Sequence, residues 1–171
     1  MPRWSEIHLW PSRVISWKHA VTSSALTGEE DVAYARGKRR STMTEYVGAI
    51  EKQTLENTYF RQVLFTAQHA QLVVMCLRPG EDIGDEVHST VDQFFRIEQG
   101  EAKFIFNEKV ERPVHAGDAV VVPAGTYHNI VNTSKTAMLK LYTIYSPPNH
   151  PDGTVHKTKA EAEAAELAEH H

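Results

Sequence analysis

Two blocks of sequence between residues 80 and 132 constrain this chain more than any other feature. The first block contains Glu86 and His88, which are two positions apart, so on a β-strand their side chains point to the same side. In the second block a short apolar run ends in a tight Pro-Ala-Gly turn, which delivers His128 on the next strand. Two strands that are distant in sequence can therefore aim imidazole and carboxylate groups at one point inside a closed sheet. This arrangement predicts a small β-barrel that holds a metal ion.

The same two blocks resemble the two motifs of the cupin superfamily. The second motif of that family is Gly, five residues, Pro-x-Gly, two residues, His, three residues and Asn, and this chain matches it at Gly117, Pro123, Gly125, His128 and Asn132. The first motif fits in its spacing over residues 80–100, but Glu86 stands where the family has its first His, and Gln93 where it has Glu. The resemblance covers roughly the second half of the chain. It implies the fold more strongly than the reaction, because this superfamily hosts many chemistries on one scaffold.

The alternation of side chains indicates which first-motif residues point inward. Gln93 shares one strand face with Phe95 and Ile97, whereas Asp92 shares the other face with charged residues. Because the other residues on its strand face are apolar, we expect Gln93 rather than Asp92 to point into the barrel, with its amide oxygen as a weak fourth ligand. The predicted ligand set is Glu86, His88, Gln93 and His128. Such a mixed N/O set suits divalent Zn, Mn, Fe, Ni or Co. The alternative is a hydrogen-bonded polar cluster without a metal.

The rest of the chain continues the β pattern. We expect strands over residues 59–66, 71–77, 86–90, 93–98, 102–106, 110–114, 119–122, 128–131 and 138–145. The continuous apolar run at residues 71–77 is typical of a strand covered on both faces. Many short strands between Gly-rich turns favour an all-β sandwich or barrel, and the cupin resemblance selects a single jelly-roll barrel over residues 43–147.

The two ends of the chain differ from this barrel. Residues 1–42 contain all three tryptophans and a basic stretch without hydrophobic periodicity, and we expect a poorly ordered extension there. A targeting segment, a gene-model extension upstream of Met43 and an arm that packs on a partner subunit are the alternatives. Residues 148–171 predict a proline-rich loop followed by an Ala- and Glu-rich helix over residues 157–170, which we expect to fray on the surface.

Composition excludes several classes of protein. The net charge of −4 argues against a nucleic-acid partner, and no apolar run approaches the length that spans a bilayer. The single Cys76 cannot form an internal disulfide, so nothing indicates a secreted, disulfide-stapled fold. We therefore expect a cytoplasmic globular protein without a membrane partner. Single-barrel cupins are often dimers that cover their edge strands, so we also expect a homodimer.

The ligand set predicts metal-dependent chemistry on a small-molecule substrate. The Glu-x-His and Asp-Gln-Phe-Phe-Arg pattern is similar to cupins grouped with mannose-6-phosphate isomerase, which implies an isomerase or lyase acting on a sugar-like or keto compound. A dioxygenase using Fe(II) and a non-enzymatic small-molecule-binding barrel are the alternatives. No catalytic base is fixed by the sequence. The candidates are Arg61, on the inward parity of an early strand, and His150 and His156, in a loop able to fold over the barrel mouth.

Overall fold

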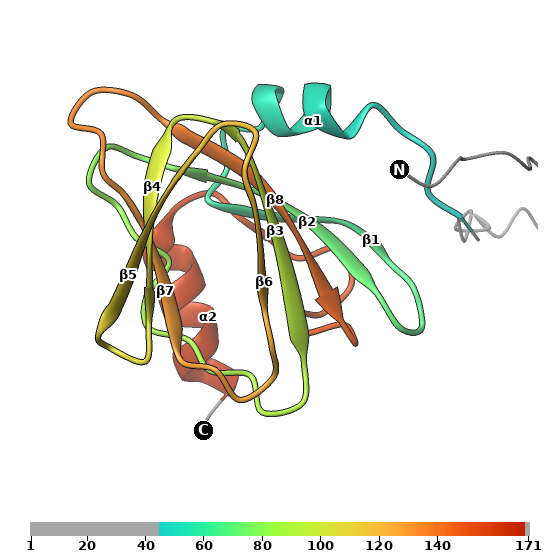
Figure 1. Cartoon of the computed structure of the whole chain (residues 1–171). Coiled ribbons are helices and arrows are strands. Elements are labelled where there is room, and N and C mark those ends of the chain that lie inside the picture. The colour runs from blue at the N-terminus through green and yellow to red at the C-terminus, as the bar shows by residue number, and fades with distance from the viewer. Residues whose placement is uncertain (1–44, 170–171) are drawn as a thin grey trace, which may run out of the picture. The chain divides into compact units, whose positions relative to one another are not determined.

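Residues 45–169 form two antiparallel sheets that face each other in the computed structural model (Figure 1). Within these residues the six-stranded sheet has the order β6-β3-β8-β2-β1-β9, and the three-stranded sheet has the order β5-β4-β7. In chain order the elements are α1 (Ile50–Glu56), β1 (Arg61–Thr66), β2 (Gln71–Leu77), β3 (Asp92–Gln99), β4 (Glu101–Phe106), β5 (Val110–His115), β6 (Ala119–Val122), β7 (His128–Asn132), β8 (Leu139–Ser146), β9 (Val155–His156) and α2 (Lys159–Glu169). The extension expected over residues 1–42 lies outside the described residues.

The hydrophobic core lies between the two sheets. Each sheet contributes the side chains on its inner face, among them Val73, Met75, Phe95, Ile97, Phe104, Ile130 and Leu141. All of these side chains are essentially excluded from solvent. Because burial of apolar surface contributes roughly 25 cal/mol per Å², this shared layer holds the sheets face to face. The expected all-β jelly-roll fold is confirmed.

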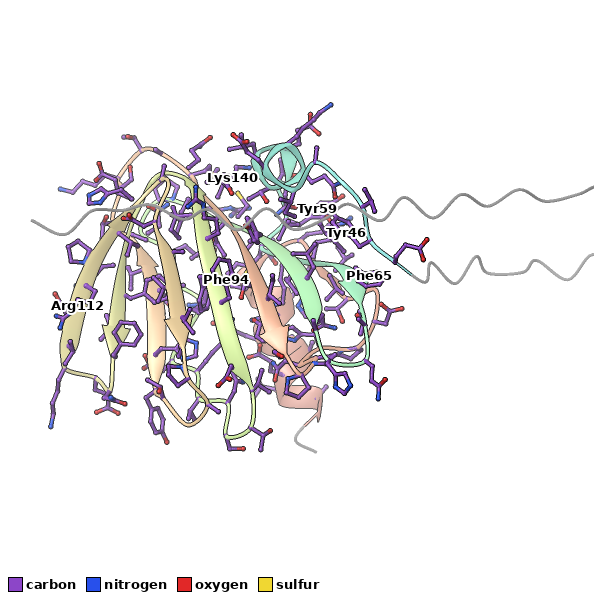
Figure 2. All side chains as sticks on the ribbon, turned by 45° about the vertical axis from the view of Figure 1, so that its right-hand side comes forward. Tyr46, Tyr59, Phe65, Phe94, Arg112 and Lys140 are labelled. Carbon is purple, nitrogen blue, oxygen red and sulfur yellow. The ribbon has the colours of Figure 1, made fainter. Side chains whose placement is uncertain are left out.

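β2 is buried on both faces, as its continuous apolar sequence predicts. Its inner side chains join the core, and α1 packs against β2 and β8 from outside. Tyr46, just before α1, packs on Phe65 with 6.1 Å between ring centroids, and the Lys140 amine donates to the Asn57 carbonyl at the end of the helix (Figure 2). We expected no helix in the barrel region. A helix of seven residues is too short for its period to be visible in the sequence.

The alternation along β3 agrees with the sequence prediction. Gln93 is 1% exposed and points into the barrel, whereas Asp92 is exposed at the start of the strand. The Asp92 carboxylate accepts a hydrogen bond from the Ala124 backbone amide at 2.9 Å. Asp92 therefore fixes the turn that precedes His128, and Gln93 faces the interior.

Residues 86–90 do not form the strand that we expected. The chain from Asp82 to Glu86 instead touches the edge of β7 at two isolated bridges, Asp82 opposite Val131 and Glu86 opposite His128. Gly84 lies between them with φ of +90°, a left-handed conformation that interrupts a regular strand. The bridge to His128 fixes the backbone at Glu86. The alternation of side-chain directions expected for Glu86 and His88 therefore holds, although no regular strand forms.

The barrel sheet extends beyond residue 147, where we had placed its boundary. β9 pairs antiparallel with β1, with His156 opposite Arg61 and Val155 opposite Gln62. A strand of two residues has no alternation that a sequence could display. The proline-rich segment therefore returns to the sheet edge before the last helix begins.

α2 packs on the barrel and does not fray as expected. Ala162 is buried in the core cluster, so the alanine-rich side of the helix is its packed face. Near the start of α2, Lys159 Nζ lies 2.7 Å from Asp82 Oδ1, and farther along Glu166 contacts Arg61 on β1. The helix, drawn in red in Figure 1, thus contacts both the Asp82 segment and β1. Neither α1 nor α2, the helices of the described residues, is long and apolar enough to cross a membrane.

Candidate metal centre

Three of the predicted ligands converge inside the barrel. Glu86 and His128 exchange both backbone hydrogen bonds of their bridge, each at 2.9 Å, which places their side chains on the same side. His88 follows two positions after Glu86, and its Nε2 lies 3.3 Å from Glu86 Oε2. One possible ligand atom from each of the three residues lies within 4.8 Å of the others. This spacing is compatible with one ion bound by all three.

Gln93 completes this set from the opposite sheet. Its Oε1 lies 3.1 Å from His128 Nε2, and its Nε2 donates to Thr143 Oγ1, also at 3.1 Å. Because Thr143 holds the amide nitrogen, the amide oxygen faces the imidazole of His128. The side chain that sequence alternation favoured over Asp92 therefore lies beside the converging groups, and its role as a fourth ligand stays a prediction.

The hydrogen bonds of His128 test whether this donor set fits a metal ion. Nδ1 lies 3.0 Å from the Thr126 carbonyl, so it carries the proton and leaves a lone pair on Nε2. Burial lowers the pKa of His128, although the Thr126 carbonyl and the Glu86 charge oppose this, so the ring is neutral near pH 7. The Nε2 lone pair then faces the amide oxygen of Gln93, and both atoms are acceptors. Two acceptors that face each other need a cation between them, so this arrangement fits a metal ion. With the amide reversed, Gln93 would donate to His128 and form the metal-free polar cluster instead.

Arg61 holds the single carboxylate of the set. Its Nη2 lies 3.1 Å from Glu86 Oε1, which leaves Oε2 of Glu86 to face both imidazoles. Burial raises the pKa of Glu86, but the hydrogen bond from His88 and the charge of Arg61 outweigh it, and the net pKa is lowered. Glu86 is therefore ionised, and its Oε2 faces the two imidazoles.

The Arg61 side chain itself is only 1% exposed. Its Nη1 lies 2.9 Å from Oε1 of Glu166 on α2, so the guanidinium lies between two carboxylates. Burial lowers the pKa of Arg61, but the groups around it, Glu86 and Glu166 among them, raise it by more. The net pKa is therefore raised, and the guanidinium keeps its charge. A buried cation requires such partners, because leaving it unpaired costs several kcal/mol, on the order of 3–5.

The structure brings the two candidate histidines to the same region. The His150 ring meets the Tyr145 ring edge-on at 5.0 Å between centroids, and Tyr145 in turn meets His88 edge-on at 5.8 Å. Burial and the nearby charge of Arg61 lower the pKa of His150 to about 3, so its imidazole is neutral near pH 7. His156 lies opposite Arg61 in the β1–β9 pair. The catalytic roles suggested for these residues stay predictions.

Sequence reasoning missed two residues of the site. Tyr145 is 1% exposed and lies directly opposite Gln93 in the β3–β8 ladder, so the two side chains share the inner face. Burial raises the pKa of Tyr145, so it remains a phenol at neutral pH. The strand prediction over residues 138–145 contained the signal for Tyr145, because its parity matches the core. Glu166 had no such signal, because the helix that carries it was expected to be solvated.

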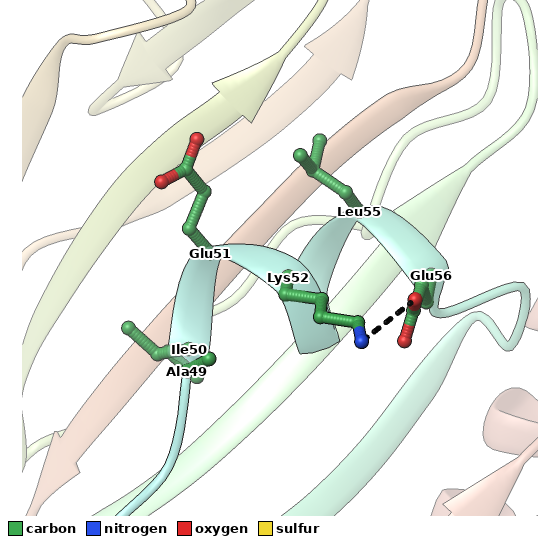
Figure 3. Close-up of a pocket in the computed structure, with 6 residues that line it drawn as sticks. All are labelled: Ala49, Ile50, Glu51, Lys52, Leu55 and Glu56. Atoms are coloured by element: carbon green, nitrogen blue, oxygen red, sulfur yellow. Dashed lines mark ion pairs between the residues drawn. The ribbon is translucent and has the colours of Figure 1, made fainter.

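A hollow on α1 is separate from this site. Among the described residues it is lined by Ala49, Ile50, Glu51, Lys52, Leu55 and Glu56, all on one short helix (Figure 3). Lys52 and Glu56 form an exposed ion pair along its rim at 3.8 Å. None of these residues belongs to the ligand set, so the hollow has no part in the metal chemistry.

Comparison with known proteins gives the family. The family model of the Cupin domain matches residues 73–145, a span that contains all four predicted ligands. YrkC of Bacillus subtilis (strain 168) is 52% identical over 126 residues, which cover 71% of this chain and 67% of that protein. The chain belongs to the cupin superfamily. L612 of Acanthamoeba polyphaga mimivirus is 46% identical over 112 residues, covering 64% of this cupin and 70% of that protein.

A solved structure supports the same conclusion. The crystal structure of BH2720 from Bacillus halodurans is 43% identical to this cupin and superposes with a TM-score of 0.70. The match covers 72% of this chain and 97% of that one. The cupin resemblance of the two motifs is therefore confirmed at the level of the whole barrel.

Proposed function

We propose that this cupin is a metal-dependent isomerase or lyase that acts on a small oxygenated substrate, either sugar-like or keto. The observation that carries the proposal is the pairing of Glu86, the one carboxylate among the predicted ligands, with Arg61 at 3.1 Å. Gln93 is a neutral amide, and His128 is neutral near pH 7 because burial lowers its pKa. The set therefore offers few negative charges to a cation.

This charge balance favours Lewis-acid chemistry over redox chemistry. Glu86, His88 and His128, with Gln93 beside them, would hold a divalent ion, which would supply Lewis acidity toward a carbonyl or hydroxyl group. Arg61 already balances the charge of Glu86, so the ligand set does little to stabilise a higher oxidation state. A dicarboxylate set would favour that state more strongly.

Residues beside the ligands are suited to hold a substrate by hydrogen bonds. Tyr145 keeps its proton because burial raises its pKa, so its phenol is able to donate a hydrogen bond to a substrate oxygen. Burial and the charge of Arg61 lower the pKa of His150 to about 3, so its imidazole stays neutral, and its ring contacts Tyr145. These two groups give the proposed substrate neutral hydrogen-bonding partners next to the ligand set.

The second candidate is an Fe(II) dioxygenase, because two histidines and one carboxylate also form a facial triad. Metal content of protein purified without chelator or affinity metal is the first measurement. The protein is then loaded with Fe²⁺ or Zn²⁺ and assayed on sugar phosphates, uronates and β-diketones while oxygen uptake is followed. Turnover with Zn²⁺ and no oxygen uptake supports the isomerase or lyase. Oxygen consumption coupled to product with Fe²⁺, and silence with Zn²⁺, would reverse the order.

A further inference from the structure

We propose that Arg61 binds the carboxylate of the substrate, and that Glu166 occupies that position until a substrate replaces it. This inference rests on the proposed function and narrows its substrate class to small carboxylates with a neighbouring hydroxyl or keto oxygen. The metal ligands take the neighbouring oxygen, and Arg61 takes the carboxylate.

The two carboxylates on Arg61 differ in how firmly they are held. Glu86 is fixed by its backbone bridge to His128, and its side chain is 15% exposed. Glu166 comes from α2 and is 52% exposed, although the guanidinium that it contacts is buried. An exposed carboxylate regains its hydration when it swings away, so its displacement costs little. Glu166 is therefore the partner that an incoming solute can replace.

Charge also favours an exchange of one carboxylate for another. Glu86 would share its negative charge between Arg61 and a dication held by the ligand set, which would weaken its hold on Arg61. The guanidinium then depends on its other partner, Glu166, which lies 2.9 Å away. A substrate carboxylate at the same position keeps the charge of the site unchanged, whereas a neutral ligand would leave the buried Arg61 with Glu86 as its one carboxylate partner.

Two buried nitrogen atoms near this position have no hydrogen-bond partner among residues 45–169. They are Arg61 Nε and His150 Nε2. Buried polar groups without partners are rare in native proteins and point to a missing polar occupant. The His150 ring meets the Tyr145 ring edge-on, and Tyr145 in turn meets His88, so His150 lies on the same side of the barrel as the ligand set. A carboxylate with a second oxygen function supplies acceptors for Arg61 Nε and a hydrogen-bonding partner for His150.

The test measures binding of lactate and of lactamide, its uncharged counterpart, to the full chain by calorimetry. Glu166→Gln removes the competing carboxylate but leaves Arg61 in place. We expect it to bind lactate at least fivefold more tightly than the parent protein, with no change for lactamide. Glu163→Gln is the matched control, because Glu163 lies on the same helix and pairs only weakly with Lys159 at 3.7 Å. It should bind lactate as the parent does.

A second variant and a second anion sharpen the test. Glu166→Asp withdraws the carboxylate by one methylene and should give a smaller gain in the same direction. Unchanged or weaker lactate binding in Glu166→Gln would overturn the proposal, as would an equal gain in Glu163→Gln. An equal gain for inorganic phosphate would overturn the carboxylate assignment.

Titrations with and without bound metal distinguish a failure of this inference from a failure of the proposed function. Each titration is run on metal-free and on Zn²⁺-loaded protein. A gain for lactate in metal-free Glu166→Gln supports the Arg61 site even if no metal-dependent activity exists. If bound metal depends on His128 but Glu166→Gln binds lactate as the parent does, this inference is overturned and the proposed function is not.

Discussion

Arg61 Nη2 and Glu86 Oε1 lie 3.1 Å apart, and this contact orients the carboxylate of the candidate metal centre. It occupies one oxygen of the carboxylate and turns the other toward His88 and His128. The same guanidinium contacts Glu166 on α2, so the candidate ligand set is connected to the last helix of the described residues. Outer partners of this kind orient metal ligands and tune their affinity.

Replacement of a central ligand should remove the metal. In His128→Ala, bound metal should fall at least tenfold, about the effect of losing one ligand, and the melting temperature of the metal-loaded protein should fall with it. The measurement is metal content by elemental analysis together with thermal unfolding. His115→Ala is the control, because His115 is exposed in a different part of the barrel. Equal metal content in His128→Ala and parent would refute the assignment.

Loss of Arg61 should affect both stability and the pH range of metal binding. Arg61→Met leaves Glu86 buried without its cation, which should lower the free energy of unfolding by about 3–5 kcal/mol. Without the Arg61 charge the pKa of Glu86 should rise, so metal binding should fail at a higher pH than in the parent. Urea unfolding and metal titrations between pH 5 and pH 8 measure the two effects. Arg112→Met, at an exposed arginine, should change neither (Figure 2); parent-like behaviour of Arg61→Met would contradict the role of Arg61.

The ion pair that fixes the start of α2 should be sensitive to acid. Burial raises the pKa of Asp82, but hydrogen bonds from Lys159 and from the Gly84 amide outweigh it, so the folded pKa lies below the ordinary value of 3.8. A depressed carboxyl pKa contributes stability that is present above 3.8 and is lost as the pH falls through the folded pKa. The pair is partly exposed, so its contribution is about 0.2–1 kcal/mol.

Asp82→Asn tests this expectation. The parent should be more stable than Asp82→Asn at pH 6, and the difference should shrink as the pH falls below 3.8. Urea midpoints at several pH values measure this difference, and Glu163→Gln reports the smaller effect of an exposed pair on the same helix. A difference that stays constant over the whole pH range would show that the Asp82 carboxylate does not titrate with folding.

The extension can be tested by starting the chain at Met43. Because residues 1–42 show no hydrophobic periodicity, we expect the melting temperature to stay within about two degrees of the parent value. Thermal unfolding and light scattering measure the stability and the oligomeric state. The homodimer stays a prediction until then. A large fall in stability, or loss of a dimer that the full chain forms, would show that the extension is an integral arm.

The ligand residues could be predicted because their information is local. Glu86 and His88 are two positions apart, and His128 follows a Pro-x-Gly turn at a fixed spacing, so a short window fixes each one. Gln93 followed from the apolar company on its strand face, and its burial agrees with that argument. The prediction of a strand at residues 86–90 was wrong, because the alternation of residue types predicts the direction of side chains and not the presence of regular strand pairing.

The surroundings of the ligands could not be predicted because they depend on distant contacts. Glu166 lies on a helix whose composition suits solvent, and its contact with Arg61 depends on the packing of α2 against the barrel. Tyr145 required the register of β8 against β3, which places it opposite Gln93. Short elements such as α1 and β9 carry too few residues for any period to be read.

The two ion pairs of Arg61 also differ in how much of the chain each one closes into a loop. The contact with Glu86 joins residues 25 positions apart, whereas the contact with Glu166 joins residues 105 positions apart. The entropy of closing a long loop opposes contacts between distant residues until the rest of the sheet is in place, so we expect the contact with Glu166 to form after the contact with Glu86. On this expectation the buried guanidinium is fully paired only when the barrel is nearly complete.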